Sequence, residues 1–306
     1  MTAASIRVGT SGYSFKDWVG TVYPRGMRPA DFLIHYASLF DAVEINSTYY
    51  RIPPPRMFVG MLRKVPRDFL FAVKLPKEMT HERAAFNEAV SPFLAAIAPL
   101  VRAGQMGGLL AQFPYAFRCD PAAWEHLERL AAAFLPRGLP LNVEFRHTGW
   151  SEPHVEARLR ELGLGAVNVD LPRLPKLPRP SNVVTSPIAY YRLHGRNAQT
   201  WWRHPTPSHR YDYLYTETEL EAWAQRAEQA AGKARIAFIF NNNCHLGQSV
   251  VNALQLHQRL HLPTPTLPPG LAPELIEHPR EALIDDLRRR IRDVRDAEPA
   301  PPIGGG

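Results

Sequence analysis

Eight short apolar runs recur along the chain, and longer segments of mixed polarity separate them. The runs span residues 6–9, 42–45, 69–74, 107–113, 141–145, 166–170, 189–194 and 235–240. Several are apolar at consecutive positions rather than at alternate ones, which is typical of strands buried on both faces of a parallel sheet. The pattern therefore predicts eight buried parallel strands.

Amphipathic helices are predicted between most of these strands. Two of them carry clear start signals, because Asp120 precedes Pro121 and Thr216 precedes Glu219 at the spacing of a capping box. After the sixth run, the proline-rich segment 171–180 takes the place of a helix. The clearest helical segments are residues 31–40, 121–134, 216–232 and 246–260.

Eight strand-then-helix units without a break in composition predict an α/β fold, a TIM-type (β/α)8 barrel formed by residues 1–262 as one domain. An open doubly wound sheet is the alternative, but residues 9–14 (GTSGYS) lack the glycine spacing of a dinucleotide-binding turn. Residues 263–306 read as a proline-rich linker, an amphipathic helix at 279–296 and a disordered tail. We expect this C-terminal helix to pack on the barrel rather than to bind a polyanion.

The formal net charge is +7 and the calculated pI is about 9.5, which permits a phosphate-bearing partner. No apolar run approaches the ~18 residues needed to cross a bilayer, and the first residues lack the apolar segment of a signal peptide. The two cysteines, Cys119 and Cys244, have no metal-site spacing. These features predict a cytoplasmic protein that does not associate with membranes, and none of them specifies an oligomeric state.

Polar residues stand at the ends of nearly all the predicted strands, where a (β/α)8 barrel places its active site. Residues two apart in a strand share a face, which pairs Glu44 with Asn46, Glu144 with Arg146, and Arg192 with His194. The same region of the other units supplies Tyr49, Lys74, His81, Gln112, His147, Asp170, Asn241 and Asn242. Any single Glu–Arg pair could be a structural ion pair. Burying so many charges is costly unless they pair or face water, so we expect most of them to share one pocket.

The segments that carry these residues resemble one family. They are GTSGYSFKDW (9–18), FDAVEINSTYYRIP (40–53), FLFAVKLPKEMTH (69–81), LLAQFP (109–114), NVEFRHTGW (142–150), YYRLHG (190–195), YDYLYTETEL (211–220) and FIFNNNCHLGQSVVNA (238–253). In this order they resemble the YecE-like family, domain-of-unknown-function family 72. The resemblance runs from about residue 6 to residue 260 and implies a TIM-type barrel, but it implies no reaction. Departures from the family pattern occur at Tyr13, at Thr148–Gly149 and at Asn243–Cys244.

The first functional hypothesis is an enzyme, either a hydrolase or a lyase or isomerase. Glu44 and Glu144 would act as general acid and base, with His147 or His194 as proton shuttle. The remaining strand-end residues would bind substrate: Asn46, Tyr49, Lys74, His81, Gln112, Arg146, Asp170, Arg192, Asn241 and Asn242. Loops after the seventh and eighth strands often hold phosphate, and here they begin at His194–Gly195–Arg196 and Asn241–Asn242. We therefore expect a small substrate with a carboxylate or a phosphate, and glycoside hydrolysis fits so basic a cluster less well.

A divalent metal is a second hypothesis for the same residues, and the cofactor stays unspecified. Metal-capable side chains include His81, Glu144, His147, Asp170 and His194. The sequence has no HxH or HExxH motif, and two arginines nearby would repel a cation. A bound metal is therefore not favoured.

A third hypothesis is a nucleic-acid-binding barrel, either endonuclease-like or non-catalytic. The segment 196–215 alternates aromatic residues, among them Trp201 and Trp202, with cationic ones, a pattern suited to base stacking. The alternative for this segment is a lid packed by its own aromatic side chains, and a ligand sensor or scaffold also remains open.

In the enzyme hypothesis, Glu144→Gln and Arg192→Ala should remove anion binding and leave folding intact.

Overall fold

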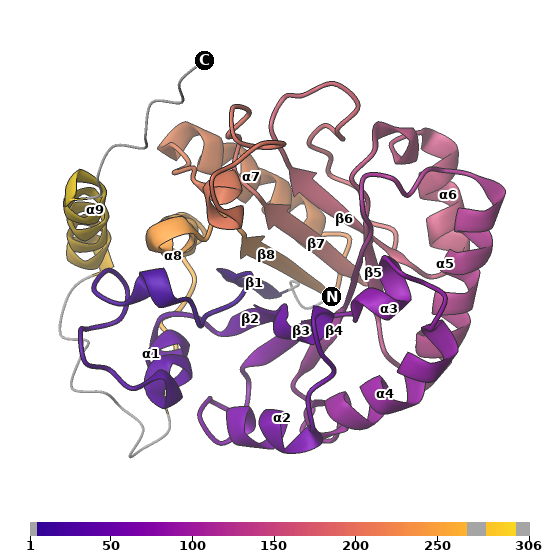
Figure 1. Ribbon diagram of the computed structural model, residues 1–306, viewed down its shortest axis with the longest axis horizontal. Helices are drawn as coiled ribbons and strands as arrows, with labels where there is room; N and C mark the ends of the chain where they lie inside the picture. Colours follow the sequence, from indigo (N-terminus) through magenta and orange to yellow (C-terminus); the bar gives the residue numbers. More distant parts are fainter. Residues whose placement is uncertain (1–4, 268–279, 298–306) are drawn as a thin grey trace.

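The protein is described by a computed structural model that covers residues 5–267 and 280–297 (Figure 1). One sheet contains eight parallel strands, hydrogen-bonded in the order β1-β8-β7-β6-β5-β4-β3-β2. The strands are β1 (Ser5–Thr10), β2 (Ala42–Ile45), β3 (Leu70–Lys74), β4 (Met106–Gln112), β5 (Leu141–Glu144), β6 (Gly165–Asp170), β7 (Ile188–Leu193) and β8 (Ile236–Asn241). All eight apolar runs form strands, and the predicted (β/α)8 barrel is confirmed.

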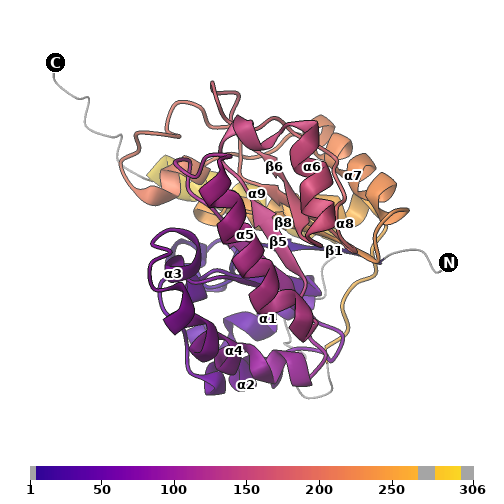
Figure 2. The ribbon, with the colours of Figure 1, turned by 90° about the vertical axis from the view of Figure 1, so that its right-hand side faces the viewer.

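Helices surround the strands on the outside of the barrel (Figures 1 and 2). The predicted caps are present, since the Asp120 side chain accepts a hydrogen bond from the Ala123 N–H and Thr216 and Glu219 form a reciprocal capping box. Within the described part of the chain, residues 171–180 form no helix, as predicted. The helices are α1 (Phe32–Leu39), α2 (Pro55–Leu62), α3 (Lys77–Thr80), α4 (Phe86–Arg102), α5 (Pro121–Phe134), α6 (Pro153–Glu161), α7 (Glu217–Ala231), α8 (Gln248–Arg259) and α9 (Arg280–Ala297).

Alternating residues of each strand face either the barrel interior or the helices. The inner face is filled by side chains such as Leu110, Tyr190 and Phe238. Val143 and Phe145 of the fifth unit face outward, where the Phe145 ring stacks on Trp150 with centroids 4.0 Å apart. The alternation of β5 therefore directs Glu144 into the barrel, toward the carboxyl ends of its neighbours.

The barrel closes between β1 and β2 in an unusual way. In the described residues these two strands share one isolated bridge, between Ser11 and Glu44, instead of a hydrogen-bonded ladder. The hydroxyl of Tyr36, from α1, accepts a hydrogen bond from the Thr10 N–H at 2.8 Å and donates to the Ala42 carbonyl at 3.0 Å. A single side chain thus joins the two strands across this seam.

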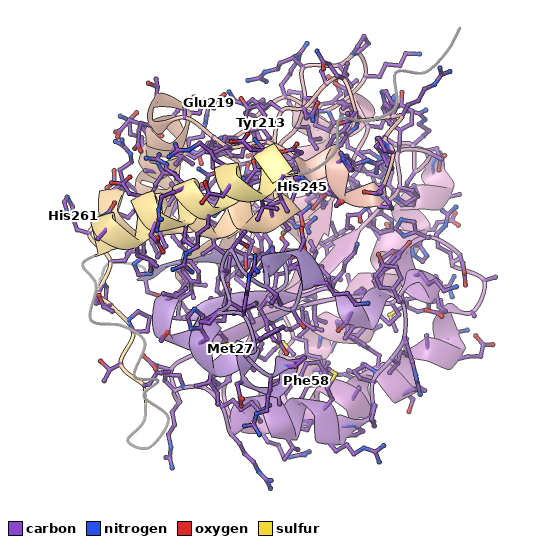
Figure 3. All side chains as sticks on the ribbon, turned by 60° about the vertical axis from the view of Figure 1, so that its left-hand side comes forward. Met27, Phe58, Tyr213, Glu219, His245 and His261 are labelled. Carbon is purple, nitrogen blue, oxygen red and sulfur yellow. The ribbon has the colours of Figure 1, made fainter. Side chains whose placement is uncertain are left out.

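The helix expected at 279–296 is α9, and it packs on α8. Its Ile284, Leu287 and Ile291 are buried, which confirms the predicted packing. Figure 3 shows α9 (yellow) with one end near His245, and there Arg295 forms an ion pair with Asp212. The rest of the predicted linker and the tail fall on residues 268–279 and 298–306, which lie outside the described residues.

The structure also bears on the expectation about membranes. Among the residues described, no helix is both long enough and apolar enough to span a bilayer.

Candidate functional site

A buried ionic cluster of Glu44, Glu144 and Arg192 lies inside the barrel at the carboxyl end of the strands. Arg192 reaches from β7 to both carboxylates, donating to Glu144 Oε2 at 2.6 Å and to Glu44 Oε1 at 2.7 Å. Tyr190 donates from its hydroxyl to the other oxygen of Glu44 at 2.7 Å. All four side chains are almost completely shielded from solvent. One guanidinium therefore compensates two carboxylates from opposite parts of the barrel.

Arg146 and His194 extend the buried ionic cluster toward the mouth of the barrel. Arg146 Nε lies 2.5 Å from Glu144 Oε1, and His194 Nε2 lies 3.3 Å from the same oxygen. Asn242 Nδ2 is 2.7 Å from His194 Nδ1. Arg146 Nη2 lies 3.3 Å from His194 Nε2, so the Asn242 amide and the Arg146 guanidinium face the two nitrogens of this ring.

Burial and charge set the protonation states in this cluster. Burial opposes ionisation of Glu144, but the guanidiniums of Arg146 and Arg192 hold its pKa well below the usual range. Burial, followed by the nearby Arg146, lowers the pKa of His194 to about 3. Glu144 is therefore an anion and His194 a neutral imidazole at pH 7.

This geometry changes the interpretation of the two carboxylates. Each carboxylate oxygen of Glu44 and Glu144 already contacts a donor or a cation within the cluster. The depressed pKa of Glu144 is the opposite of what a general acid needs. The geometry instead matches the structural ion pair that the sequence left open as an alternative.

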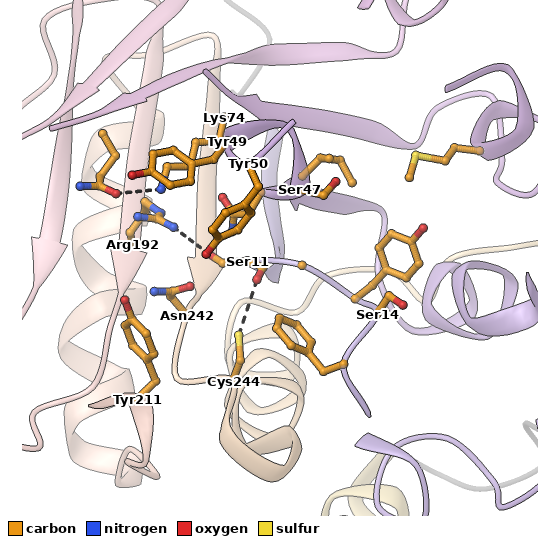
Figure 4. Close-up of a pocket in the computed structure, with 17 residues that line it drawn as sticks. Ser11, Ser14, Ser47, Tyr49, Tyr50, Lys74, Arg192, Tyr211, Asn242 and Cys244 are labelled. Atoms are coloured by element: carbon orange, nitrogen blue, oxygen red, sulfur yellow. Dashed lines mark hydrogen bonds between the residues drawn. The ribbon is translucent and has the colours of Figure 1, made fainter. Parts of the chain in front are cut away.

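A cavity of about 430 Å³ opens above the buried ionic cluster at the barrel mouth (Figure 4). Lys74, Arg192, Asn242 and Tyr211 lie along one side of it, and Ser14 and Ser47 lie on the other. The further lining residues are Ser11, Gly12, Tyr13, Phe15, Ile45, Asn46, Tyr49, Tyr50, Met61, Gln112 and Cys244. The cavity wall is therefore rich in amides, hydroxyls and aromatic rings, and its cations come from β3 and β7.

Lys74 is a cation of this cavity, and within the described part of the chain no carboxylate lies at ion-pair distance from its ammonium. Its ammonium donates to Gln112 Oε1 at 2.8 Å and lies 4.2 Å from the centroid of the Tyr49 ring. Burial, followed by the charge of Arg192, lowers the pKa of Lys74 to about 7. The His81 ring packs edge-on against the Tyr49 ring, with the two centroids 4.9 Å apart. Burial lowers the pKa of His81 to about 4. A side chain that exchanges a proton near pH 7 thus faces an open cavity.

Three residues expected in the site lie elsewhere. Asp170 points outward to α7, where it accepts hydrogen bonds from Arg196 at 2.8 Å and from Trp223 at 3.2 Å. Asn241 also points outward, donating to the Gly9 carbonyl at 3.3 Å. His147 accepts a hydrogen bond from the Gly149 N–H within its own turn. Asp170 and Asn241 occupy the outward positions of their strands, so they belong to the support of the barrel rather than to the cavity.

The expected phosphate loops after β7 and β8 are already occupied by protein contacts. The Gly195 N–H donates to the Tyr215 hydroxyl at 2.8 Å, and the Asn242 N–H donates to the Leu193 carbonyl at 2.7 Å. Arg196 pairs with Asp170 and with Glu219 of α7. These donors therefore face neighbouring protein groups instead of the cavity.

The segment 196–215 packs as a lid at the rim of the barrel. Trp201 is buried, and the guanidiniums of Arg146 and Arg210 lie 5.7 and 5.4 Å from its ring. Tyr211 lines the cavity, whereas Trp202 is half-exposed. Most of the aromatic side chains that suggested base stacking therefore turn inward, in agreement with the lid alternative.

Two features of the site were missed in the sequence. Tyr190 shares a strand face with Arg192 and His194, so the same period of two would have identified it. Cys244 and Tyr211 line the cavity from loops, for which the sequence carries no periodic signal. In the described part of the chain, no group of three or more His, Cys, Asp or Glu side chains is arranged to hold a metal ion.

The shifted histidines predict a loss of stability in mild acid. Unfolded histidine titrates near 6.5, whereas burial lowers the pKa of His194 to about 3 and those of His35 and His81 to about 4. Between these values the unfolded chain binds more protons, so the free energy of unfolding should fall as the pH drops below 6.5. The limit for each group is about 1.4 kcal/mol per pKa unit.

Urea unfolding between pH 7 and pH 4 measures this effect, with His194→Gln as the variant. The variant should show a shallower dependence on pH than the parent protein. An unchanged dependence would mean that the pKa of His194 is the same in the folded and the unfolded protein.

Comparison with known proteins agrees with the barrel and with the resemblance of the strand-end segments. The family model described as "Protein of unknown function DUF72" matches residues 7–275. The UPF0759 protein YunF of Bacillus subtilis is 27% identical over 293 residues, which cover 89% of this chain and 99% of YunF. The UPF0759 protein YecE of Escherichia coli is 31% identical over 147 residues, or 45% of this chain and 52% of YecE.

Two solved structures have the same architecture. A DUF72 family protein from Thermotoga maritima is 39% identical with a TM-score of 0.77, covering 84% of this chain and 99% of that one. A DUF72 family protein from Enterococcus faecalis is 27% identical with a TM-score of 0.76, covering 87% and 98%. The chain therefore belongs to the DUF72 family.

Proposed function

We propose that this protein is an enzyme that binds a small carboxylate- or phosphate-bearing substrate in the cavity at the barrel mouth. The observation that carries the proposal is the placement of Lys74, whose ammonium faces the cavity with an amide and an aromatic ring as its neighbours. Among the described residues no carboxylate lies within ion-pair distance of it. An anionic substrate would supply the missing counter-charge.

The surrounding charges favour an anion over a cation at this position. Glu44 and Glu144 are both engaged by guanidiniums below the cavity, so neither competes for Lys74. Arg192 also lines the cavity, and Asn242 adds an amide. Electrostatic interactions in such a partly buried site are stronger than in water.

Lys74 is also the group best suited to acid/base work. Efficient proton transfer needs a group with a pKa close to the working pH, and burial together with Arg192 lowers the pKa of Lys74 to about 7. We assign Lys74 the acid/base role that the sequence suggested for the carboxylates. Glu44 and Glu144 then serve to position Arg192. Hydrolysis, elimination and isomerisation all fit a base of this kind.

A nucleic-acid ligand has weaker support. Trp202 and Tyr50 are exposed near the mouth, but Trp201 and Tyr211 are committed to the lid and the cavity. A closed aromatic lid leaves few rings free for base stacking.

Replacing Lys74 tests the proposal directly. Isothermal titration with inorganic phosphate and with 2-phosphoglycolate should show binding to the parent protein. Lys74→Met should lower the affinity by about 10-fold or more, because a hydrogen bond to a charged group contributes about 1.5–3 kcal/mol.

The matched control is Lys64→Met, since the Lys64 ammonium donates a solvent-exposed hydrogen bond to the Ala30 carbonyl and Lys64 does not line the cavity. That variant should bind as the parent does. Equal affinity of the parent and Lys74→Met would exclude Lys74 from the anion site.

A further inference from the structure

The environment of Lys74 resembles that of a nucleophilic amine. Lys74 ends β3, so its backbone is fixed by the strand, and its side chain is held by Gln112 and by the face of the Tyr49 ring. Lysine becomes nucleophilic when it is desolvated or placed near another cation. Both conditions hold here, since Lys74 is partly buried and Arg192 lines the same cavity.

Among the described residues, no carboxylate lies within ion-pair distance of the Lys74 ammonium, and Glu44 and Glu144 act on it only from farther away. The two acidic side chains inside this part of the barrel are bonded to Arg192, Arg146 and Tyr190. If the function of Lys74 were only to neutralise a buried charge, a direct ion pair would be expected. The side-chain oxygen of Gln112 accepts one hydrogen bond from the Lys74 nitrogen, so the lone pair of the neutral amine is available after deprotonation.

We propose that Lys74 forms a covalent iminium with the carbonyl carbon of a small oxo acid bound in this cavity. The inference rests on the proposed function: Lys74 attracts the oxo acid as an ammonium and reacts as the neutral amine, and Arg192 and Asn242 of the same cavity then remain to hold the carboxylate. The expected substrates are therefore small acids that carry an aldehyde or ketone group next to the carboxylate. The cavity of about 430 Å³ has room for a molecule of a few carbon atoms.

The chemical step balances without a further reagent. The lone pair of the neutral Lys74 amine attacks the carbonyl carbon, and the C=O π electrons move to oxygen. The nitrogen then loses a proton to that oxygen, which gives a carbinolamine. A proton from solvent converts the hydroxyl into water, which leaves as the C=N bond forms. The products are the iminium cation and one water molecule.

The iminium indicates which class of reaction the site would catalyse. It withdraws electrons from the neighbouring carbon and so favours loss of a proton or cleavage of a C–C bond there. The lyase or isomerase branch of the proposed function is the one this chemistry fits. Tyr49 and Asn242 line the same cavity and offer a hydroxyl and an amide to orient the bound acid.

Reductive trapping with glyoxylate tests the inference on the full-length protein. With sodium cyanoborohydride present, the iminium is reduced to a stable secondary amine, and peptide mapping by mass spectrometry locates it. Lys74 should be modified more than about 10-fold faster than Lys64, because a larger fraction of it is unprotonated near pH 7. The rate at Lys74 should rise with pH through about 7, whereas exposed lysines should respond near 10.5.

Controls separate this inference from the proposed function. Glycolate, which has the carboxylate but lacks the carbonyl, should slow the labelling of Lys74 by competition, and Lys74→Arg should abolish the adduct in a protein with a parent-like circular dichroism spectrum. If glyoxylate binds by calorimetry but labels Lys74 no faster than Lys64, the covalent step is wrong and anion binding stands. If neither glyoxylate nor phosphate binds, both proposals fail.

Discussion

Arg192→Met should lower the free energy of unfolding by about 3–5 kcal/mol, the usual result of leaving buried charges without their partner. Arg192 is the bridge between Glu44 and Glu144, with contacts of 2.7 and 2.6 Å. Arg146 and Tyr190 would still bond to one carboxylate each. Two buried acids would nevertheless share much less positive charge. Urea unfolding at pH 7 measures the loss.

A triple variant provides the control for this prediction. Glu44→Gln/Glu144→Gln/Arg192→Met removes both carboxylates together with the arginine that bridges them, so no buried carboxylate is left without a partner. Arg146, which is partly exposed, loses its ion pair with Glu144 in this variant. It should be more stable than Arg192→Met alone. If the single variant is as stable as the parent, the buried ionic cluster does not contribute to folding. That outcome would restore the expectation drawn from the sequence, in which Arg192→Ala leaves the fold intact.

Gly9→Ala should destabilise the protein by about 3 kcal/mol or more, at the upper end of what overpacking costs. A Cβ atom at Gly9 would lie 2.1 Å from the Ala42 carbonyl oxygen and 2.9 Å from the Tyr36 hydroxyl. The carbonyl belongs to the backbone of β2 and cannot rotate away. The substitution would therefore push β1 from β2 and break the hydrogen bonds of Tyr36 across the seam.

Gly60→Ala is the matched control, because a Cβ at Gly60 meets no atom within 4 Å. Gly60 lies within α2, where alanine is favoured over glycine by about 1 kcal/mol, so this variant should be at least as stable as the parent. Thermal unfolding of both variants measures the difference in their stability. A Gly9→Ala protein as stable as Gly60→Ala would mean that β1 and β2 can move apart at the seam without a loss of stability.

The fold could be predicted from the sequence because each strand is marked locally. Apolar runs such as 141–145 and 235–240 lie within a residue or two of β5 and β8. The capping signals at Asp120 and Thr216 fix the starts of α5 and α7. Parallel strands separated by helices leave few topologies open.

The sequence predicts the candidate site only through strand parity, the alternation of side chains between the two faces of a strand. Parity groups Glu144 with Arg146 and Arg192 with His194, and the structure brings all four together at the barrel mouth. The same parity would have placed Asp170 and Asn241 outside, since Val169 and Phe240 face inward. These two residues were included because they end a strand, and position alone does not decide which way a side chain points.

The role of the carboxylates could not be read from the sequence. Glu44 and Arg192 are 148 positions apart, and their contact depends on how far a guanidinium reaches across the barrel. A glutamate that is free for catalysis and a glutamate that is held by two arginines cannot be distinguished in an amino-acid sequence. The contacts of 2.5 and 2.6 Å that Arg146 and Arg192 make with Glu144 distinguish them, which is why we propose the acid/base role for Lys74.

The electron density of crystals soaked in 2-phosphoglycolate decides whether Lys74 binds an anion. We expect the anion in the cavity at the barrel mouth, with an oxygen within hydrogen-bond distance of Lys74 Nζ. Density for the anion at another surface, with only water beside Lys74, would contradict this expectation.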